Sequence, residues 1–175
     1  MNDLRDQLKQ CLTGRLCFMG LGNIDYGDDA FGVRLAEALI DCEVPNVIIA
    51  GTTPDRWIGR AAGFDHVVFL DAVEFGRDPG SVVFLDSAQM TARFPQVSTH
   101  KISLGALAQW LEANGHTKAW LLGVQPESLK PVQQLTPPLQ KSLELLVDLL
   151  TAHVGTDAFS RPPDRKLGSE LEVNA

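Results

Sequence analysis

The chain has 175 residues, 45% apolar and 21% charged, which is the composition of a globular protein with a hydrophobic core. Its formal net charge of −7 argues against a nucleic-acid partner, because such a partner requires clustered basic side chains. No apolar run approaches the roughly 20 residues of a membrane span, and residues 1–10 lack an apolar signal core, so we expect a cytoplasmic protein without a membrane partner.

Strand and helix patterns alternate along the chain. Leucines spaced four apart predict a short amphipathic helix over residues 2–12. Apolar runs predict strands at 15–20, 47–50, 66–73, 81–85 and 119–124, and helical spacing predicts helices at 29–41, 54–62, 103–114 and 137–153. We expect residues 86–100 to carry the chain back across a single domain of residues 1–154. From residue 155 the composition becomes polar, which predicts a mobile tail over residues 155–175.

The connection between the third and fourth predicted strands is short. Residues 74–80 contain two glycines and a proline, and they cannot hold a crossover helix. A parallel return needs about a dozen residues or more, so the strand at 81–85 is predicted to run antiparallel, next to the third strand or at the sheet edge. The chain should therefore form a three-layer α/β/α sandwich around a five-stranded, mostly parallel sheet with one antiparallel strand.

A glycine-rich turn with three acids joins the first strand to the following helix. It reads GLGNIDYGDDAFG over residues 20–32. A strand–turn–helix join normally prepares a site for an anion, but Asp25, Asp28 and Asp29 favour a cation. A dinucleotide site is disfavoured because the GxGxxG spacing fails and the acids would repel a pyrophosphate. The chain also lacks a phosphate loop, an HExxH zinc motif and a GxSxG nucleophile motif.

Two carboxylates and one imidazole are predicted to meet at the carboxyl ends of the strands, where open α/β sheets bind ligands. Asp29 follows the first strand, Asp71 closes the apolar part of the third, and His100 precedes a helix. This set suits a borderline divalent metal such as nickel or zinc. Three protein ligands would leave positions open for substrate or water.

The same residues have structural interpretations. One acid of the pair Asp28 and Asp29 suffices to cap the following helix, and we assign that role to Asp28. Asp71 could instead bond a neighbouring turn, because a buried carboxylate needs a partner. His100 could be structural or exposed. The odd number of cysteines and the absence of a CxxC pair indicate reduced thiols, and Cys17 lies in mid-strand without an adjacent base.

Four blocks, taken in order, resemble the hydrogenase maturation endopeptidases, which finish the large subunit of nickel–iron hydrogenases. The blocks are the turn already described, FLDAV at 69–73, STHKISL at 98–104 and GVQPESL at 123–129. They fit the family over about residues 15–152. The resemblance implies that Asp29, Asp71 and His100 are the metal-binding and catalytic residues. The fold it implies is also a three-layer α/β/α sandwich with one antiparallel strand.

The resemblance implies an enzyme that removes a short C-terminal extension from the nickel-loaded precursor of a hydrogenase large subunit. The nickel would belong to the substrate and serve as the recognition signal, so we expect no tightly bound resident metal. The metal could polarise the scissile carbonyl or activate water, or a carboxylate could act as general base. A pepsin-like aspartate pair lacks a supporting Asp-Thr-Gly motif. We expect a monomer. The alternatives are a peptidase or amidase with resident zinc and a non-enzymatic nucleotide-binding module.

Overall fold

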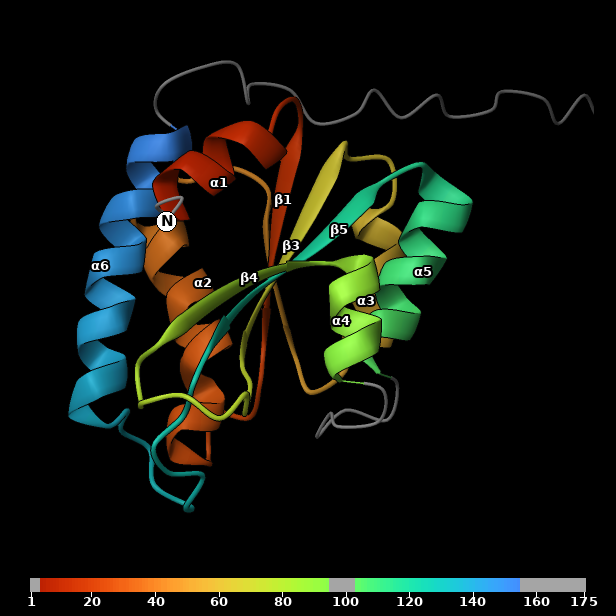
Figure 1. The fold of residues 1–175 in the computed structure, drawn as a ribbon. Coiled ribbons are helices and arrows are strands. Elements are labelled where there is room, and N and C mark those ends of the chain that lie inside the picture. The colour runs from red at the N-terminus through yellow and green to blue at the C-terminus, as the bar shows by residue number, and fades with distance from the viewer. Residues whose placement is uncertain (1–3, 95–102, 155–175) are drawn as a thin grey trace, which may run out of the picture.

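The computed structural model describes residues 4–94 and 103–154 (Figure 1). The predicted tail at 155–175 lies outside these residues. The elements, in chain order, are α1 Leu4–Cys11, β1 Leu16–Leu21, the 3-10 helix η1 Gly27–Ala30, α2 Phe31–Asp41, β2 Val47–Gly51, α3 Pro54–Ala61, β3 His66–Ala72, β4 Val82–Asp86, α4 Ser87–Arg93, α5 Leu104–Gly115, β5 Lys118–Val124 and α6 Pro137–Val154. The predicted elements end within two residues of these bounds.

The five strands form one sheet in the order β2-β1-β3-β5-β4. β1, β2, β3 and β5 are parallel, whereas β4 pairs antiparallel with β5, with Val82 opposite Val124. The antiparallel strand predicted from the short connection at 74–80 is thus confirmed. It lies at the sheet edge, since β5 occupies the position beside β3.

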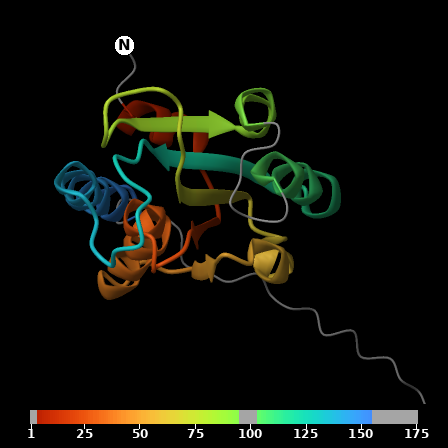
Figure 2. The same cartoon turned by 90° about the horizontal axis from the view of Figure 1, so that it is seen from below.

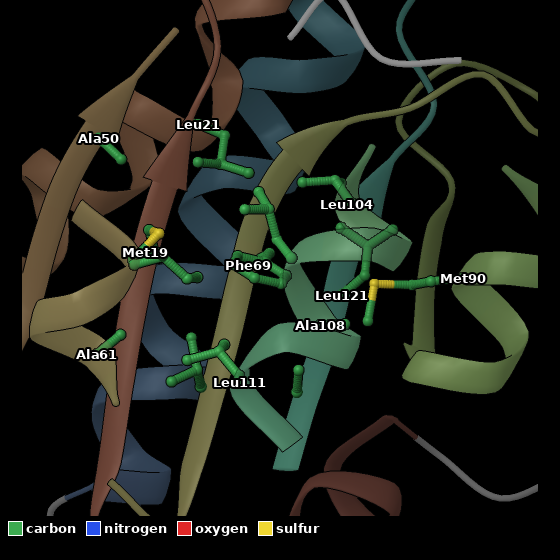
Figure 3. Close-up of a cluster of buried hydrophobic side chains, with 14 of the residues drawn as sticks. Met19, Leu21, Ala50, Ala61, Phe69, Met90, Leu104, Ala108, Leu111 and Leu121 are labelled. Atoms are coloured by element: carbon green, nitrogen blue, oxygen red, sulfur yellow. The ribbon is translucent and has the colours of Figure 1, made fainter. Parts of the chain in front are cut away.

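Helices cover both faces of the sheet, which confirms the predicted three-layer sandwich. α1, α2 and α6 pack on one face, and α3, α4 and α5 pack on the other (Figure 2). Along β3, Phe69 faces the α3–α5 layer beside Met19 and Leu111 (Figure 3). Leu70 faces the opposite layer, where it shares a core cluster with residues of α2. Burial on both faces explains why the strand is apolar at successive positions. Within the described residues, no helix is long and apolar enough to cross a bilayer.

α4 was not predicted from the sequence, which led us to expect only a return segment at 86–100. Asp86 starts this helix with a capping box. Its carboxylate accepts a hydrogen bond from the Gln89 amide (2.8 Å), and the Gln89 side chain accepts one from the Asp86 amide (3.0 Å). Met90 anchors the helix in the core. With one buried side chain in seven residues, α4 has almost no hydrophobic periodicity, so only its cap could have indicated it.

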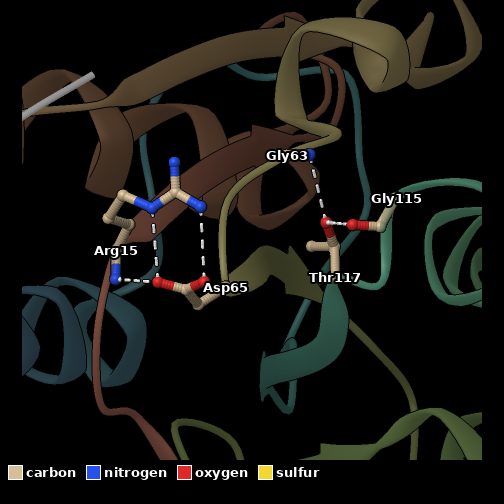
Figure 4. A network of polar contacts seen from close by, with 5 residues as sticks. All are labelled: Arg15, Gly63, Asp65, Gly115 and Thr117. Atoms are coloured by element: carbon tan, nitrogen blue, oxygen red, sulfur yellow. Dashed lines mark hydrogen bonds and ion pairs between the residues drawn. The ribbon is translucent and has the colours of Figure 1, made fainter. Parts of the chain in front are cut away.

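Polar contacts connect the loops at the amino ends of the strands (Figure 4). Asp65, just before β3, accepts hydrogen bonds from the Arg15 amide (2.6 Å) and from its guanidinium (3.4 Å for each of two nitrogens). The Thr117 hydroxyl accepts a hydrogen bond from the Gly63 amide (3.2 Å) and donates one to the Gly115 carbonyl (3.3 Å). These contacts hold together the loops preceding β1, β3 and β5.

The Asp65 contacts predict a pH dependence of stability. The hydrogen bond from the Arg15 amide, more than any other contact, holds the pKa of Asp65 below its ordinary value. A lowered folded-state pKa stabilises the fold above the unfolded pKa of about 3.9, and this contribution is lost as the pH falls through the folded value. We expect the wild type to exceed Asp65→Asn in urea midpoint at pH 6, with the difference disappearing in acid. A difference that grows towards low pH would contradict this.

Candidate active site

The ends of neighbouring strands bring two of the predicted site residues to one edge of the sheet. β1 and β3 are parallel with Gly20 opposite Leu70, so Asp71 lies level with the last residue of β1. On its other side Asp71 is opposite Gly123 of β5. Asp29 lies in η1, directly beyond β1, and η1 contacts β3. η1 and the amino ends of α2 and α5 therefore lie at the carboxyl edge of the sheet (Figure 1).

The glycines of the turn allow the helix to lie directly on the strand ends. A Cβ atom at Gly32 would overlap the carbonyl oxygen of Leu70, in β3. Gly22 has φ of +120°, and a Cβ atom there would overlap the carbonyl oxygen of Asp29. Both positions require glycine, Gly22 for its backbone conformation as well as for space. The glycines therefore serve close packing around Asp29, and no phosphate site is needed to explain them.

Substitution of Gly32 by alanine is expected to destabilise the fold by about 1–3 kcal/mol or more, because backbone must move to admit the methyl group. Gly59 in α3 is the matched control, since a Cβ atom there would have no neighbour within 4 Å. Gly59→Ala should be neutral or stabilising by up to about 1 kcal/mol, because alanine favours the helix. Thermal unfolding of the two variants checks both values. Equal stability of the two would contradict the packing argument.

Asp29 is held by hydrogen bonds within its own turn. The residue is only 7% exposed, and Oδ2 accepts a hydrogen bond from the Asn23 amide (2.9 Å). Its own amide donates to the Tyr26 carbonyl (3.0 Å), which closes the turn. Oδ1 accepts no hydrogen bond from the part of the chain that the structure describes. Among the described residues, Oδ2 is thus the Asp29 carboxylate oxygen that accepts a hydrogen bond.

Asp71 is 5% exposed, although it lies near the end of its strand. Side chains alternate along β3, which places Asp71 on the same face as Phe69 and towards α5. α5 begins at the same edge, where Leu104 lies close to the level of Leu21 (Figure 3). The side chain of Asp71 therefore faces the α3–α5 layer at the carboxyl edge of the sheet.

His100, the third predicted site residue, lies outside the described residues, so its position relative to the two carboxylates stays a prediction. Within residues 4–94 and 103–154, no three His, Cys, Asp or Glu side chains form a group that could hold a metal ion. Of the three predicted site residues, the structure therefore places two, Asp29 and Asp71, at the carboxyl edge of the sheet.

The prediction that Asp28 caps the helix is wrong. The residue at the N-cap of α2 is Ala30, and no side chain caps either η1 or α2. Asp28 is instead fully buried and accepts hydrogen bonds from the amides of Glu127 (2.9 Å), Ser128 (3.0 Å) and Thr136 (2.7 Å). The Thr136 hydroxyl donates a fourth (2.9 Å). These donors satisfy a charge that burial would otherwise make costly.

Two other side chains that could take part in chemistry, Cys17 and His66, are not part of this candidate site. Burial raises the pKa of the Cys17 thiol to about 12, so it is protonated and unsuited to nucleophilic attack. His66 begins β3 at the amino edge, where its Nδ1 accepts a hydrogen bond from the indole of Trp120 (3.0 Å). Burial lowers the pKa of His66, in keeping with a neutral, structural histidine.

Comparison with known proteins agrees with the resemblance carried by the four blocks. Residues 33–153 match the model of the HycI hydrogenase maturation protease family. The chain is 31% identical over 158 residues to the hydrogenase 2 maturation protease of Escherichia coli K12, a match covering 84% of this chain and 96% of that protein.

Solved structures show the same likeness. The [NiFe] hydrogenase maturation protease HycI of Thermococcus kodakarensis superposes with a TM-score of 0.75 at 30% identity, covering 87% of this chain and 98% of that one. The hydrogenase maturating endopeptidase HybD of E. coli gives 0.70 at 30% identity, covering 81% and 92%. From the matching sequence, fold and chain length, this protein is an endopeptidase belonging to the hydrogenase maturation protease family.

Proposed function

We propose that this endopeptidase removes a C-terminal extension from the nickel-loaded precursor of a nickel–iron hydrogenase large subunit. The observation that carries the proposal is the pair of buried carboxylates, Asp29 in η1 and Asp71 in β3, at the carboxyl edge of the sheet in a chain of this family. Buried carboxylates are retained where they meet donors or cations. Asp29 keeps one oxygen uncommitted among the described residues.

His100 completes the proposed set of nickel ligands. Ser103 caps α5 through a hydrogen bond from the Ala106 amide (3.2 Å), and α5 starts at the edge that carries the two acids. His100 is three positions before Ser103, a span of at most about 11 Å in extended chain. An imidazole and two carboxylates suit nickel. We assign the nickel to the substrate, as its recognition signal.

Capture of the ion would orient the peptide bond to be cut. Holding the reacting groups in place can supply roughly 7–11 kcal/mol of the barrier to such a reaction. Water is then activated either by the metal or by one carboxylate, which takes the proton as hydroxide adds to the carbonyl carbon. The leaving amine takes up a proton as the C–N bond breaks. Asp29, Asp71 and His100 thus act as ligands, and one of the acids is the candidate base.

The test is incubation of the purified enzyme with nickel-loaded precursor, followed by intact-mass measurement of the product. The proposal predicts one shorter product that has lost residues from its C-terminus only. A precursor of unchanged mass, or internal cleavage at several sites, would overturn it.

Metal analysis of the purified enzyme separates this proposal from a peptidase with resident zinc. Because we assign the ion to the substrate, the enzyme alone should carry far less than one equivalent of zinc or nickel. One equivalent that survives dialysis against a chelator, with cleavage lost once it is stripped, would favour the resident-metal alternative.

A further inference from the structure

Asp28 joins two segments that are about 100 residues apart in the sequence. Its four hydrogen bonds all come from residues 127, 128 and 136. Backbone bonds run between the same segments, from the Asp28 amide to the Ser128 carbonyl (3.3 Å) and from the Gly27 amide to the Val132 carbonyl (2.5 Å). The loop between β5 and α6 is therefore fastened to η1 mainly through one buried carboxylate.

The next residue in η1 is Asp29, so this attachment also limits where Asp29 can lie. The Asp29 carbonyl rests against Gly22, its amide bonds to Tyr26, and its side chain bonds to Asn23. Those contacts all lie within the turn itself. The bonds of Asp28, together with the bond from the Gly27 amide, tie the turn to residues 127–136 beyond β5.

We propose that Asp28 is a positioning residue. Its hydrogen bonds to residues 127–136, which we call the clasp, hold that loop against η1 and thereby fix the Asp29 carboxylate for binding of the substrate's nickel ion. This inference rests on the proposed function. Asp28 itself is fully buried and committed to four donors, so it acts through Asp29 and does not touch the ion.

The donors around Asp28 make asparagine a sharp probe. Both carboxylate oxygens face donors, Oδ1 the Thr136 amide and Oδ2 the amides of Glu127 and Ser128. A carboxamide has the same size but places an NH₂ group against one of these donors, whichever way it is turned. Asp28→Asn therefore breaks the clasp on one side without changing the volume of the core.

Thr136 provides a graded series. Thr136→Val removes only the hydroxyl donor to Asp28, and Thr136→Ser retains it. We expect Asp28→Asn to lower kcat for nickel-loaded precursor about 10- to 100-fold, the range seen when groups supporting a metal ligand are removed. Thr136→Val should give a smaller loss and Thr136→Ser wild-type rates. The double variant should lose less than the product of the single losses, because both changes break the same clasp.

The matched control is Asp65→Asn, the same substitution in a carboxylate that bonds a distant loop at the opposite edge (Figure 4). All rates are measured at a temperature where circular dichroism shows each variant folded. Asp65→Asn should leave kcat unchanged. Wild-type kcat in folded Asp28→Asn, or an equal fall in Asp65→Asn, would overturn the positioning role.

Hydrogen exchange distinguishes failure of the clasp from failure of the proposed function. Asp28→Asn should speed exchange in residues 20–30 and 127–136, whereas Asp29→Asn should leave residues 127–136 protected. Unchanged exchange in Asp28→Asn would overturn the clasp. Absence of cleavage by the wild type would overturn the proposed function, whatever the exchange shows.

Discussion

Asp29→Asn is expected to reduce cleavage of nickel-loaded precursor by at least about 100-fold, because a displaced metal ligand misplaces the bond to be cut. The amide can still accept the hydrogen bond that the Asn23 amide now donates to Oδ2, so the turn should stay folded. Gel mobility of the precursor over time measures the effect. Asp25→Asn is the matched control, since Asp25 lies in the same turn and is exposed. This variant should cleave the precursor at the wild-type rate.

Asp71→Asn and His100→Ala should give losses of similar size. Asp78→Asn, at an exposed acid in the loop after β3, is the control for Asp71. Full cleavage by any two of the three site variants would remove the site assignment. A loss in Asp71→Asn with an equal loss in Asp78→Asn would point to a general effect of charge.

Precursor without nickel is expected to remain uncut, even at enzyme concentrations that process the loaded form completely. Under the proposed function, the three side chains bind the precursor through its nickel ion, so the orientation of the peptide bond is lost without that ion. The measurement compares loaded and nickel-free precursor side by side by gel mobility. Reloading the nickel-free precursor should restore cleavage, which controls for damage. Efficient cutting of nickel-free precursor would contradict recognition through the metal.

The fold could be predicted from the sequence where local pattern and chain length determine it. β3 is apolar at successive positions because both of its faces are covered, and the connection at 74–80 is too short for anything but an antiparallel return. The position of β4 could not be predicted in the same way. It depends on β5, a strand formed much later in the chain, which takes the place beside β3.

The edge of the sheet at which the two acids lie was predictable from the sequence, and the contacts that support those acids were not. The ends of β1 and β3 predicted that Asp29 and Asp71 lie at the same edge of the sheet, because parallel strands end at one edge. The role of Asp28 could not be seen, because its donors lie 99 to 108 residues away in a loop without regular structure. The sequence next to Asp28 favoured a helix cap. In the structure, the Asp28 carboxylate instead accepts hydrogen bonds from the distant amides.

The most direct test of the central claim is X-ray absorption at the nickel edge of loaded precursor, frozen with enzyme before cleavage. Binding by Asp29, Asp71 and His100 predicts added oxygen and nitrogen ligands at about 2.0–2.2 Å, the usual range for such donors on a metal of this size. Those ligands should be reduced in number with Asp29→Asn and unchanged with Asp25→Asn. A nickel spectrum identical with and without wild-type enzyme, in a mixture that goes on to cleave, would contradict the account.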